Sequence, residues 1–269
     1  MFRAVITDLD GTLLNKDHLL TEFTKDTIDK LLDKGIKVFV ATGRIQKGAR
    51  AIADQFKHKL PLITTNGSRV IDENNNELLS IFLKDEISKY LVDFDYKKYG
   101  SEIFINGYSG TNWFVVDDLY KNFYLTKRLD KKYRPTQIEI EEFKKYKYNK
   151  IYFIGEYEHL LKIREVLRKD IGEYANIAFV SKNSLEIYDK NATKGNAAKF
   201  LLEKYGISLD EAISFGDGLN DIEMLTMTKK GYIMGNALTE LKEMLPNHEI
   251  IEDSDTDAVA RKIIEVFNL

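Results

Sequence analysis

The sequence predicts an α/β protein in which a doubly wound parallel sheet is interrupted by a second, inserted α+β domain. Three observations indicate this. Apolar strands alternate with amphipathic helices at both ends of the chain. The middle has a different composition, since most of the 15 tyrosines lie between Tyr90 and Tyr188. The length of 269 residues is sufficient for two domains of ordinary size.

The first part of the chain predicts a βαβαβ unit. The expected strands are almost continuously apolar, as parallel strands buried on both faces are. Gly35 stands where the first helix should end. The expected strands are 2–9, 36–42 and 60–65, and the expected helices are 21–35 and 46–57.

The block 84–190 is predicted to be the inserted α+β domain, and 1–83 with 191–269 the core domain. Alternating segments in the block suggest a half-exposed sheet. Its expected strands are 112–118, 150–156, 177–182 and 184–189, and its expected helices are 85–100 and 156–172. After the block the βα pattern returns, with helices at 193–206, 220–228 and 256–267 and strands at 211–217 and 230–237.

Composition excludes several classes of function. The net charge of −3 gives no overall basic field for nucleic acid. The absence of cysteine excludes disulfides and thiolate zinc sites. No apolar run approaches the roughly 20 residues of a membrane helix, and the N-terminus lacks a signal-peptide pattern. We therefore expect a cytoplasmic protein without nucleic-acid or membrane partners.

Two carboxylates, Asp8 and Asp10, stand at the end of the first strand. In an extended strand residues i and i+2 face the same way, so these side chains are expected to approach one point. Gly11 follows and allows a sharp bend. A bound Mg²⁺ would relieve the repulsion between the two carboxylates. Alone the pattern is weak, because aspartate is also a common helix cap.

Further polar groups follow other strands and strengthen the interpretation. Thr42 and Gly43 end the second strand, where a hydroxyl and backbone amides suit a phosphate oxygen. Asp217 follows a later strand between two glycines. Lys194 begins a helix, where a positive charge is unfavourable unless an anion is bound. Because the carboxyl ends of parallel strands meet at one edge, these groups together predict a Mg²⁺–phosphate site.

The motifs resemble those of the haloacid dehalogenase-like phosphohydrolases, most closely the Cof-type branch with a large α/β cap. The matching segments are DLDGTLL, ATGR, TNGS, TKGNA, GDGLNDIEML and MGNA, in family order across nearly the whole core. The resemblance implies a Rossmann-like core, a cap at 84–190 and a Mg²⁺-dependent phosphatase. Asp8 would be the nucleophile and Asp10 the general acid/base, as in the family.

The resemblance also implies the remaining site residues. Mg²⁺ would be held by Asp8, the backbone carbonyl of Asp10, and Asp217. The phosphate group would be bound by Leu9 (through its amide), Thr42, Gly43, Lys194 and Asn220. Two further residues would support the site, Asp221 and Asn66.

The substrate is predicted only by class, a small phosphorylated metabolite. Sugar phosphates are the first expectation and phosphorylated cofactors the second. The cap should set specificity, and its aromatic residues, such as Trp113, Tyr108 and Tyr188, are candidates to line its pocket. A sugar phosphomutase on the same scaffold and a non-catalytic phosphate-binding regulator remain alternatives, although the complete set of charged residues favours catalysis.

Overall fold

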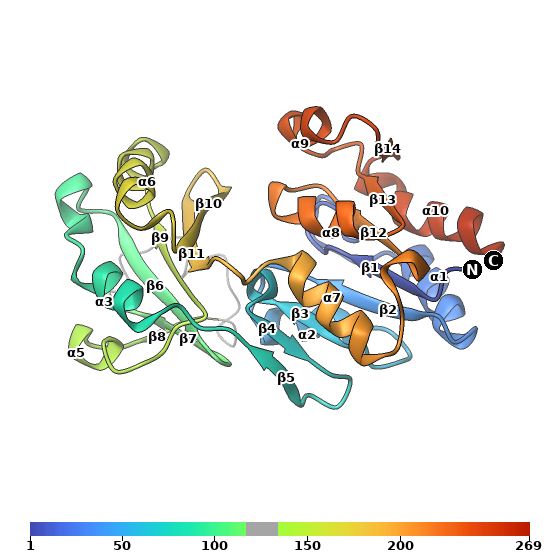
Figure 1. Ribbon diagram of the computed structural model, residues 1–269, viewed down its shortest axis with the longest axis horizontal. Helices are drawn as coiled ribbons and strands as arrows, with labels where there is room; N and C mark the ends of the chain where they lie inside the picture. Colours follow the sequence, from blue (N-terminus) through green and yellow to red (C-terminus); the bar gives the residue numbers. More distant parts are fainter. Residues whose placement is uncertain (117–133) are drawn as a thin grey trace. The chain divides into compact units, whose positions relative to one another are not determined.

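The computed structural model describes residues 1–116 and 134–269 (Figure 1). The chain divides into two compact units. Unit 1 comprises Met1–Leu79 and Thr193–Leu269, and unit 2 comprises Ser80–Ala192. Unit 1 carries an eight-stranded sheet and unit 2 a six-stranded sheet.

The sheet of unit 1 has the order β14-β13-β12-β1-β2-β3-β4-β5, and its first six strands pair in parallel. Strand β4 is antiparallel to β3. β1 lies between β2 and β12. The strands that follow β1 in the sequence therefore extend the sheet on one side of it, and the strands after unit 2 extend it on the other. The strands are β1 (Ala4–Thr7), β2 (Lys37–Ala41), β3 (Leu62–Thr64), β4 (Arg69–Ile71), β5 (Glu77–Ser80), β12 (Ala212–Gly216), β13 (Lys230–Ile233) and β14 (Glu249–Ile250).

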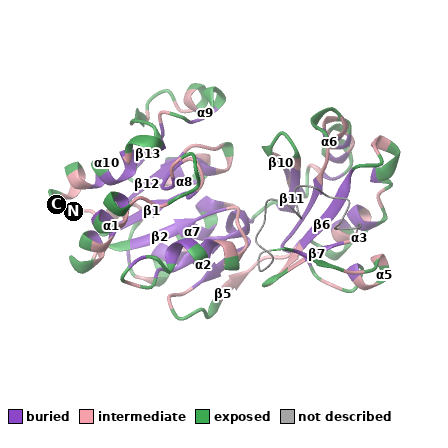
Figure 2. Cartoon of the chain, turned by 180° about the vertical axis from the view of Figure 1, so that it is seen from behind, coloured by how far each residue is buried: buried purple, intermediate pink, exposed green. Residues whose placement is uncertain are grey.

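Helices cover both faces of this sheet, because successive β1 residues supply two different cores. Val5 packs in one core with residues of α1 (Glu22–Asp33), α2 (Gln46–Ala53), α9 (Thr239–Met244) and α10 (Ala258–Phe267). Ala4 and Ile6 pack in the other with residues of α7 (Lys194–Lys204) and α8 (Ile222–Met227). The strands are therefore buried on both sides, as Figure 2 shows. This arrangement confirms the predicted doubly wound parallel sheet.

Local signals explain where α1 begins and ends. The Thr21 side chain accepts a hydrogen bond from the Thr24 amide, which caps the helix N-terminus. Gly35 has a φ of 82° directly after the last turn, a conformation that glycine adopts without strain. Short 3₁₀ helices connect other elements: η1 (Thr65–Gly67), η2 (Tyr96–Tyr99), η4 (Leu209–Glu211), η5 (Leu219–Asp221) and η6 (Ser254–Thr256).

The sheet of unit 2 has the order β10-β11-β9-β6-β7-β8. The pairs from β10 to β7 are antiparallel, and β7 pairs with β8 in parallel. The strands are β6 (Phe104–Ser109), β7 (Asn112–Val115), β8 (Thr136–Gln137), β9 (Lys150–Ile154), β10 (Ala175–Ser181) and β11 (Ser184–Asp189). The helices of its described part are α3 (Asp85–Asp93), α5 (Ile140–Phe143) and α6 (Tyr157–Ile171).

Unit 2 differs from the sequence prediction in several places, and the short elements β8 and α5 were not predicted. The prediction lacked β6, which is a central strand whose pattern is interrupted by Asn106 and Gly107. The helix expected over 85–100 ends at Asp93, because Phe94 adopts an extended conformation. The predicted strand 112–118 extends beyond Val116, and its last two residues lie outside the described part.

Candidate active site

Strand β1 ends at Thr7, one residue before the first aspartate. The Asp8 amide still donates to the Phe215 carbonyl at 3.1 Å, but the chain then turns, with the Leu14 amide donating to the Leu9 carbonyl at 2.9 Å. Gly11 has a φ of 78°. The argument from strand alternation is therefore wrong for this pair, because Asp10 lies in a turn beyond the strand.

Lys194 is the centre of the charged cluster. Its Nζ donates to Asp8 Oδ1 at 2.6 Å and to Asp221 Oδ1 at 2.7 Å. All three residues are buried. The position of the lysine is set by α7, which begins at Lys194 and is capped by the Thr193 side chain. A buried ammonium between two carboxylates is thus built into the carboxyl edge of the sheet.

Asp221 holds the loop that follows β12. Its Oδ2 accepts hydrogen bonds from the amides of Asp217 at 3.1 Å and Gly218 at 2.9 Å. Gly216 makes this close approach possible, because a Cβ there would lie 2.5 Å from the Asp221 Cβ. Asp221, which the sequence predicted as a supporting residue, is therefore hydrogen-bonded to both Lys194 and the loop that contains Asp217.

Asp217 completes a group of three carboxylates. Oxygen atoms from Asp8, Asp217 and Asp221 lie within 4.8 Å of one another. Thr12 Oγ1 donates to Asp217 Oδ1 at 2.9 Å, which joins the turn after β1 to the loop after β12. A Cβ on Gly11 would lie 2.4 Å from Asp217 Oδ2, so glycine is required at that point of the turn.

Burial and mutual repulsion dominate the electrostatics of these carboxylates. Burial raises the pKa of Asp8 well above its usual range, and Asp221 and Asp217 add to this while Lys194 opposes it. Burial and Asp221 raise the pKa of Asp217 to about 6. Asp221 and Asp8 raise the pKa of Lys194 against the effect of burial, so its ammonium stays charged. One lysine therefore does not neutralise the cluster, and the donor set fits a divalent cation.

Asp10 lies in a different environment. Arg44 binds its carboxylate with two donors, Nε to Oδ2 at 2.7 Å and Nη2 to Oδ1 at 2.5 Å. His18 Nδ1 lies 2.9 Å from Oδ1. Burial raises the pKa of Asp10, but the bonds to Arg44 and His18 outweigh it and the pKa is lowered.

Sequence reasoning missed this ion pair, and it expected Lys194 alone as the cation beside the aspartates. The signal was present, because Arg44 ends the ATGR motif immediately after two predicted phosphate-binding residues. A nucleophile should be ionised and a general acid protonated. Here the pKa of Asp8, the predicted nucleophile, is raised, and the pKa of Asp10, the predicted general acid, is lowered.

Three residues predicted to bind phosphate or support the site also contact one another: Thr42 after β2, Asn66 after β3 and Asn220 after β12. Asn220 Nδ2 donates to Asn66 Oδ1 at 3.1 Å, and the Asn66 amide donates to the Thr42 carbonyl at 3.1 Å. A Cβ on Gly43 would lie 2.9 Å from Asn66 Oδ1. The Leu9 side chain packs in the core of unit 1 and its carbonyl accepts from the Leu14 amide, so the predicted phosphate contact would have to come from the Leu9 amide.

Asn236 is a positioning residue to which sequence reasoning gave no role. Its Nδ2 donates to the Gly11 carbonyl at 2.7 Å, and its Oδ1 accepts from the Ser254 amide at 2.9 Å. It thus connects the turn after β1 to the C-terminal part of the chain. The MGNA motif, which contains it, was the available signal.

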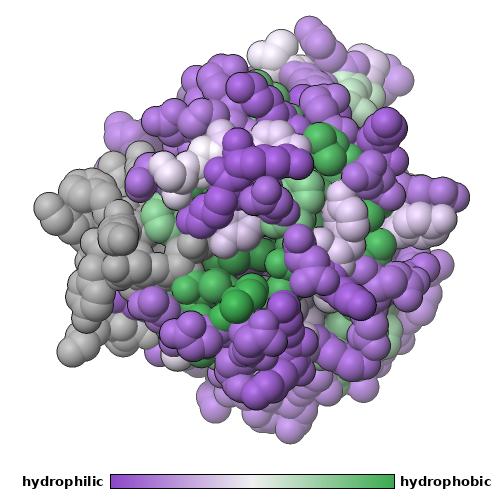
Figure 3. Space-filling model, turned by 90° about the vertical axis from the view of Figure 1, so that its left-hand side faces the viewer, coloured by the Kyte–Doolittle hydropathy of each residue, from purple (hydrophilic) through white to green (hydrophobic). Residues whose placement is uncertain are grey.

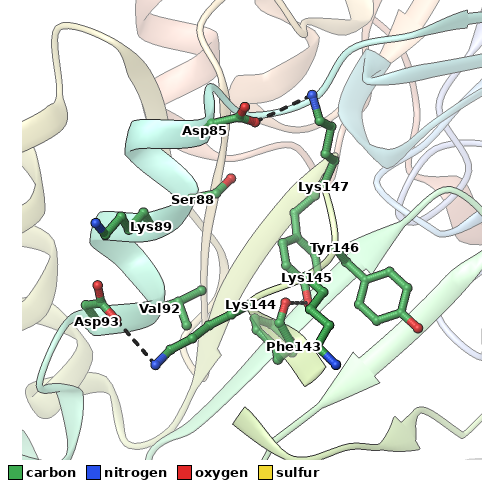
Figure 4. A pocket seen from close by; sticks show the side chains of 11 residues that line it. Asp85, Ser88, Lys89, Val92, Asp93, Phe143, Lys144, Lys145, Tyr146 and Lys147 are labelled. Carbon is green, nitrogen blue, oxygen red and sulfur yellow. Dashed lines mark hydrogen bonds and ion pairs between the residues drawn. The ribbon is translucent and has the colours of Figure 1, made fainter. Parts of the chain in front are cut away.

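A separate pocket of about 450 Å³ lies within unit 2, between α3 and residues 143–148 (Figure 4). Figure 3, viewed from the left-hand side of Figure 1, shows a group of hydrophobic residues surrounded by hydrophilic ones on that face of the molecule. Two of the pocket's lysines face carboxylates, Lys147 with Asp85 at 3.7 Å and Lys144 with Asp93 at 3.9 Å. The pocket contains none of the predicted site residues.

Among the described residues no helix is long and apolar enough to span a membrane.

The chain is similar in sequence to known proteins. Residues 5–263 match the family model of the haloacid dehalogenase-like hydrolases. A protein of Buchnera aphidicola subsp. Baizongia pistaciae (strain Bp), named "Putative phosphatase", is 35% identical over 268 residues, 99% of each chain. The "HMP-PP phosphatase" of Serratia proteamaculans (strain 568) is 30% identical over 261 residues, 97% of this chain and 93% of the relative.

The fold is also similar to that of a solved structure. The crystal structure of a haloacid dehalogenase-like hydrolase from Bacteroides thetaiotaomicron matches with a TM-score of 0.83 and 22% identity, covering 99% of this chain and 100% of that one. These findings confirm the predicted enzyme class, a phosphoric monoester hydrolase. The chain belongs to the haloacid dehalogenase-like hydrolases.

Proposed function

We propose that this enzyme is a Mg²⁺-dependent phosphatase that hydrolyses small phosphomonoesters through an aspartyl phosphate on Asp8. The observation that carries the proposal is the buried Lys194 between Asp8 and Asp221, beside Asp217. This arrangement gives one carboxylate oxygen as nucleophile, a fixed positive charge next to it, and acidic ligands for a cation.

The carboxylates of Asp8 and Asp217 and the backbone carbonyl of Asp10 would hold Mg²⁺. When bound, the cation supplies positive charge that favours ionised Asp8 and offsets charge on the phosphoryl group. Asp221 is fully engaged with Lys194 and two amides, so we assign it a positioning role. The raised pKa values of Asp8 and Asp217 support the need for such a cation.

In the first step an Asp8 carboxylate oxygen attacks phosphorus, and the bond from phosphorus to the leaving-group oxygen breaks. Asp10 gives its proton to that oxygen. In the second step Asp10 takes a proton from water, the water oxygen attacks phosphorus, and the bond to Asp8 breaks, which releases inorganic phosphate. Lys194, Thr42, Gly43 and Asn220, with the amide of Leu9, would hold the phosphoryl oxygens.

Asp10 must change its partners before it can act as an acid. Its bidentate pair with Arg44 favours the ionised form. A bound phosphate group near Thr42 and Gly43 would compete for the Arg44 guanidinium, since arginine also binds phosphate bidentately. Release from Arg44 would allow Asp10 to take up the proton that the first step requires.

Sugar phosphates and phosphorylated cofactors are the proposed substrates, and unit 2 is the proposed specificity domain. The relatives named as phosphatases support the reaction class. The core site binds phosphate and metal only, so the leaving group must be recognised elsewhere. The aromatic composition of unit 2 suits the recognition of a ring.

Rapid-quench kinetics with the variants Asp8→Asn and Asp10→Asn test the proposal. Asp8→Asn should form neither phosphoenzyme nor product. Asp10→Asn should give a burst of phenol from an aryl phosphate, followed by slow turnover, because water lacks its base. With a sugar phosphate it should lose about 10²–10⁴-fold in the first step, because an alkoxide needs the acid. Equal losses with both leaving groups and no burst would contradict these roles.

The same assay separates the proposed phosphatase from a phosphomutase. A phosphatase releases inorganic phosphate from a phosphomonoester without any added bisphosphate. A mutase would keep the phosphoryl group on the enzyme or return it to a sugar. Release of phosphate that is stoichiometric with phenol over many turnovers is the expected result.

A further inference from the structure

Thr193 is the residue at which the chain returns from unit 2 to unit 1. Lys194 follows it directly and is the first residue of α7. The Lys194 ammonium lies at the end of a flexible stem of four carbons. Its approach to Asp8 therefore depends on how the backbone is held at Thr193.

The Thr193 hydroxyl has two hydrogen-bond partners. It accepts from the Asn196 amide at 3.1 Å, which caps the N-terminus of α7. It donates to Glu223 Oε2, a carboxylate oxygen on α8. A hydroxyl has a single proton, so its donation to Glu223 turns a lone pair toward the Asn196 amide. Glu223 therefore sets the orientation of the side chain that caps α7.

Glu223 also lies against the first turn of α7. A Cβ on the buried Gly195 would lie 2.5 Å from the Glu223 Cβ, so only glycine permits this approach. Beyond this contact the two helices pack side by side (Figure 1), with Ala197 and Met224 in one hydrophobic core. The N-terminus of α7 is thus seated directly on α8.

Two bonds therefore join the same two segments of the chain. The inner bond, between Lys194 and Asp221, is buried and is made by the long side chain of a lysine. The outer bond, between Thr193 and Glu223, is exposed and is made by the short side chain of a threonine. Because that side chain is short, the outer bond restrains the backbone that carries the lysine.

We propose that Glu223 is a positioning residue for phosphoryl transfer. Through the Thr193 hydroxyl it holds the first turn of α7, so that Lys194 Nζ stays between Asp8 and Asp221. Among the described residues the Glu223 carboxylate bonds the Thr193 hydroxyl and no member of the proposed catalytic set, so it acts through its neighbour. The proposal rests on the phosphatase function above and adds a residue to the same site.

The kinetics of four variants on an aryl phosphate test this role. Glu223→Ala removes the acceptor but leaves the capping oxygen of Thr193. It should lower kcat about tenfold to hundredfold, as the loss of a residue that orients an active-site group commonly does. Thr193→Val removes the hydroxyl and should cause at least the same loss. Glu223→Gln and Thr193→Ser keep an acceptor and a hydroxyl, and each should recover most of the activity. KM should change less than kcat, because the ammonium acts mainly on charge that develops during transfer.

Glu203→Ala is the matched control, because Glu203 is an exposed glutamate of α7 whose ionic partner is Lys199 at 4.0 Å. Its kcat should equal that of the wild type. Urea denaturation of each variant separates positioning from stability. A loss of stability in Glu223→Ala with unchanged kcat would show that the bond is structural only, and would overturn the proposal.

A double-mutant cycle tests whether Glu223 acts through Thr193. Both changes remove the same bond, so the variant with Glu223→Ala and Thr193→Val should lose no more activity than Thr193→Val alone. Losses that multiply would mean that the two residues act separately, which would refute the proposal.

The two proposals fail in different ways. If the wild-type enzyme is active and Glu223→Ala has the same kcat, the phosphatase function stands and the role of Glu223 is wrong. If the wild-type enzyme hydrolyses no phosphomonoester, the phosphatase function is wrong, and calorimetry of inorganic phosphate binding with Mg²⁺ then tests the positioning role. The dissociation constant should rise in Glu223→Ala and return toward the wild-type value in Glu223→Gln. Equal constants in the three proteins, or no binding at all, would overturn the positioning role as well.

Discussion

At the scale of single residues, the structure separates the roles of two neighbouring acids, Asp217 and Asp221. Asp221 bonds Lys194 and two backbone amides, whereas the side chain of Asp217 bonds Thr12 and lies in the carboxylate group. Removing the Asp221 carboxylate breaks a buried ion pair. Removing the negative charge of Asp217 relieves repulsion between carboxylates.

Asp221→Ala should therefore destabilise the fold by about 3–5 kcal/mol, the usual loss when one partner of a buried pair is removed. Urea denaturation measures this loss. Asp217→Asn is the matched control, and its free energy of unfolding should be equal to or above that of the wild type at pH 8 while phosphatase activity disappears. A larger loss of stability in Asp217→Asn than in Asp221→Ala would contradict the assigned roles.

Stability without metal should depend on pH through Asp217. Its folded-state pKa of about 6 lies above the ordinary value of 3.8. The folded chain therefore binds the proton more tightly than the unfolded chain, and the stability gained from the protonated group is lost as the pH rises from 3.8 to about 6. Mg²⁺ competes with that proton for the carboxylate.

The stabilisation by Mg²⁺ should consequently grow between pH 5 and pH 7.5. At a Mg²⁺ concentration one hundred times the dissociation constant the gain is about 2.7 kcal/mol. Thermal denaturation with Mg²⁺ and with EDTA at each pH measures it, and Asp217→Asn should reduce the pH dependence, the remainder coming from Asp8, whose pKa is also raised. An identical gain at pH 5 and pH 7.5 would show that Mg²⁺ does not bind at these carboxylates.

Sequence reasoning expected Asp8, Asp217 and Lys194 to lie together, because a parallel sheet brings the ends of its strands to one edge, and in the structure these side chains belong to one cluster. It missed the partner of Asp10, although the ATGR motif placed Arg44 at the end of the neighbouring strand. That contact joins positions 10 and 44 through the length and direction of an arginine side chain, which no local pattern specifies. Likewise Asn236 acts on Gly11 across 225 residues of sequence.

At the scale of elements, the turn η1 is fitted closely against the start of α7. Gly67 has a φ of 95°, and a Cβ there would lie 2.1 Å from the Thr193 carbonyl oxygen. Asn66, in the same turn, has a φ of 56° and holds Asn220. The turn therefore couples the position of α7, and with it Lys194, to Asn220, one of the proposed phosphate-binding residues.

Gly67→Ala should lower both stability and activity. The backbone conformation costs about 1 kcal/mol for any residue with a Cβ, and the clash with Thr193 adds to it. Gly35→Ala is the matched control, because Gly35 has a φ of 82° with nothing within 4 Å of a Cβ. Urea denaturation and kcat/KM should show a larger loss in Gly67→Ala for both quantities. Equal losses in the two variants would mean that the contact with α7 is unimportant.

The elements themselves were largely predictable where the pattern was strong. The three strands β1, β2 and β12 are mostly apolar runs, and α1 has both a cap and a glycine just after its last turn. Strand β6 was missed because Asn106 and Gly107 weaken its pattern. The structure explains both residues, since Asn106 bonds Trp113 and a Cβ on Gly107 would lie 2.4 Å from the Tyr148 ring.

At the scale of the whole molecule, the two units have separate hydrophobic cores. Among the described residues, the cores of unit 1 draw on residues up to Leu79 and from Ala197 on, and the core of unit 2 draws on residues between Ser80 and Ala192. The proposed active-site residues Asp8, Asp10, Lys194 and Asp217 all belong to unit 1. Unit 1 should therefore fold and retain its chemistry without unit 2.

Joining Leu79 to Thr193 through a short glycine–serine linker tests this expectation and the assignment of specificity to unit 2. Circular dichroism and a cooperative urea transition would first establish that the truncated chain folds. It should then hydrolyse an aryl phosphate, whose leaving group needs little recognition, but lose the ranking among ring and acyclic esters that the full chain shows. Asp8→Asn in the truncated chain is the control for contaminating phosphatase. If the folded truncated chain kept the same ranking of substrates, specificity would reside in unit 1 and the proposed role of unit 2 would be wrong.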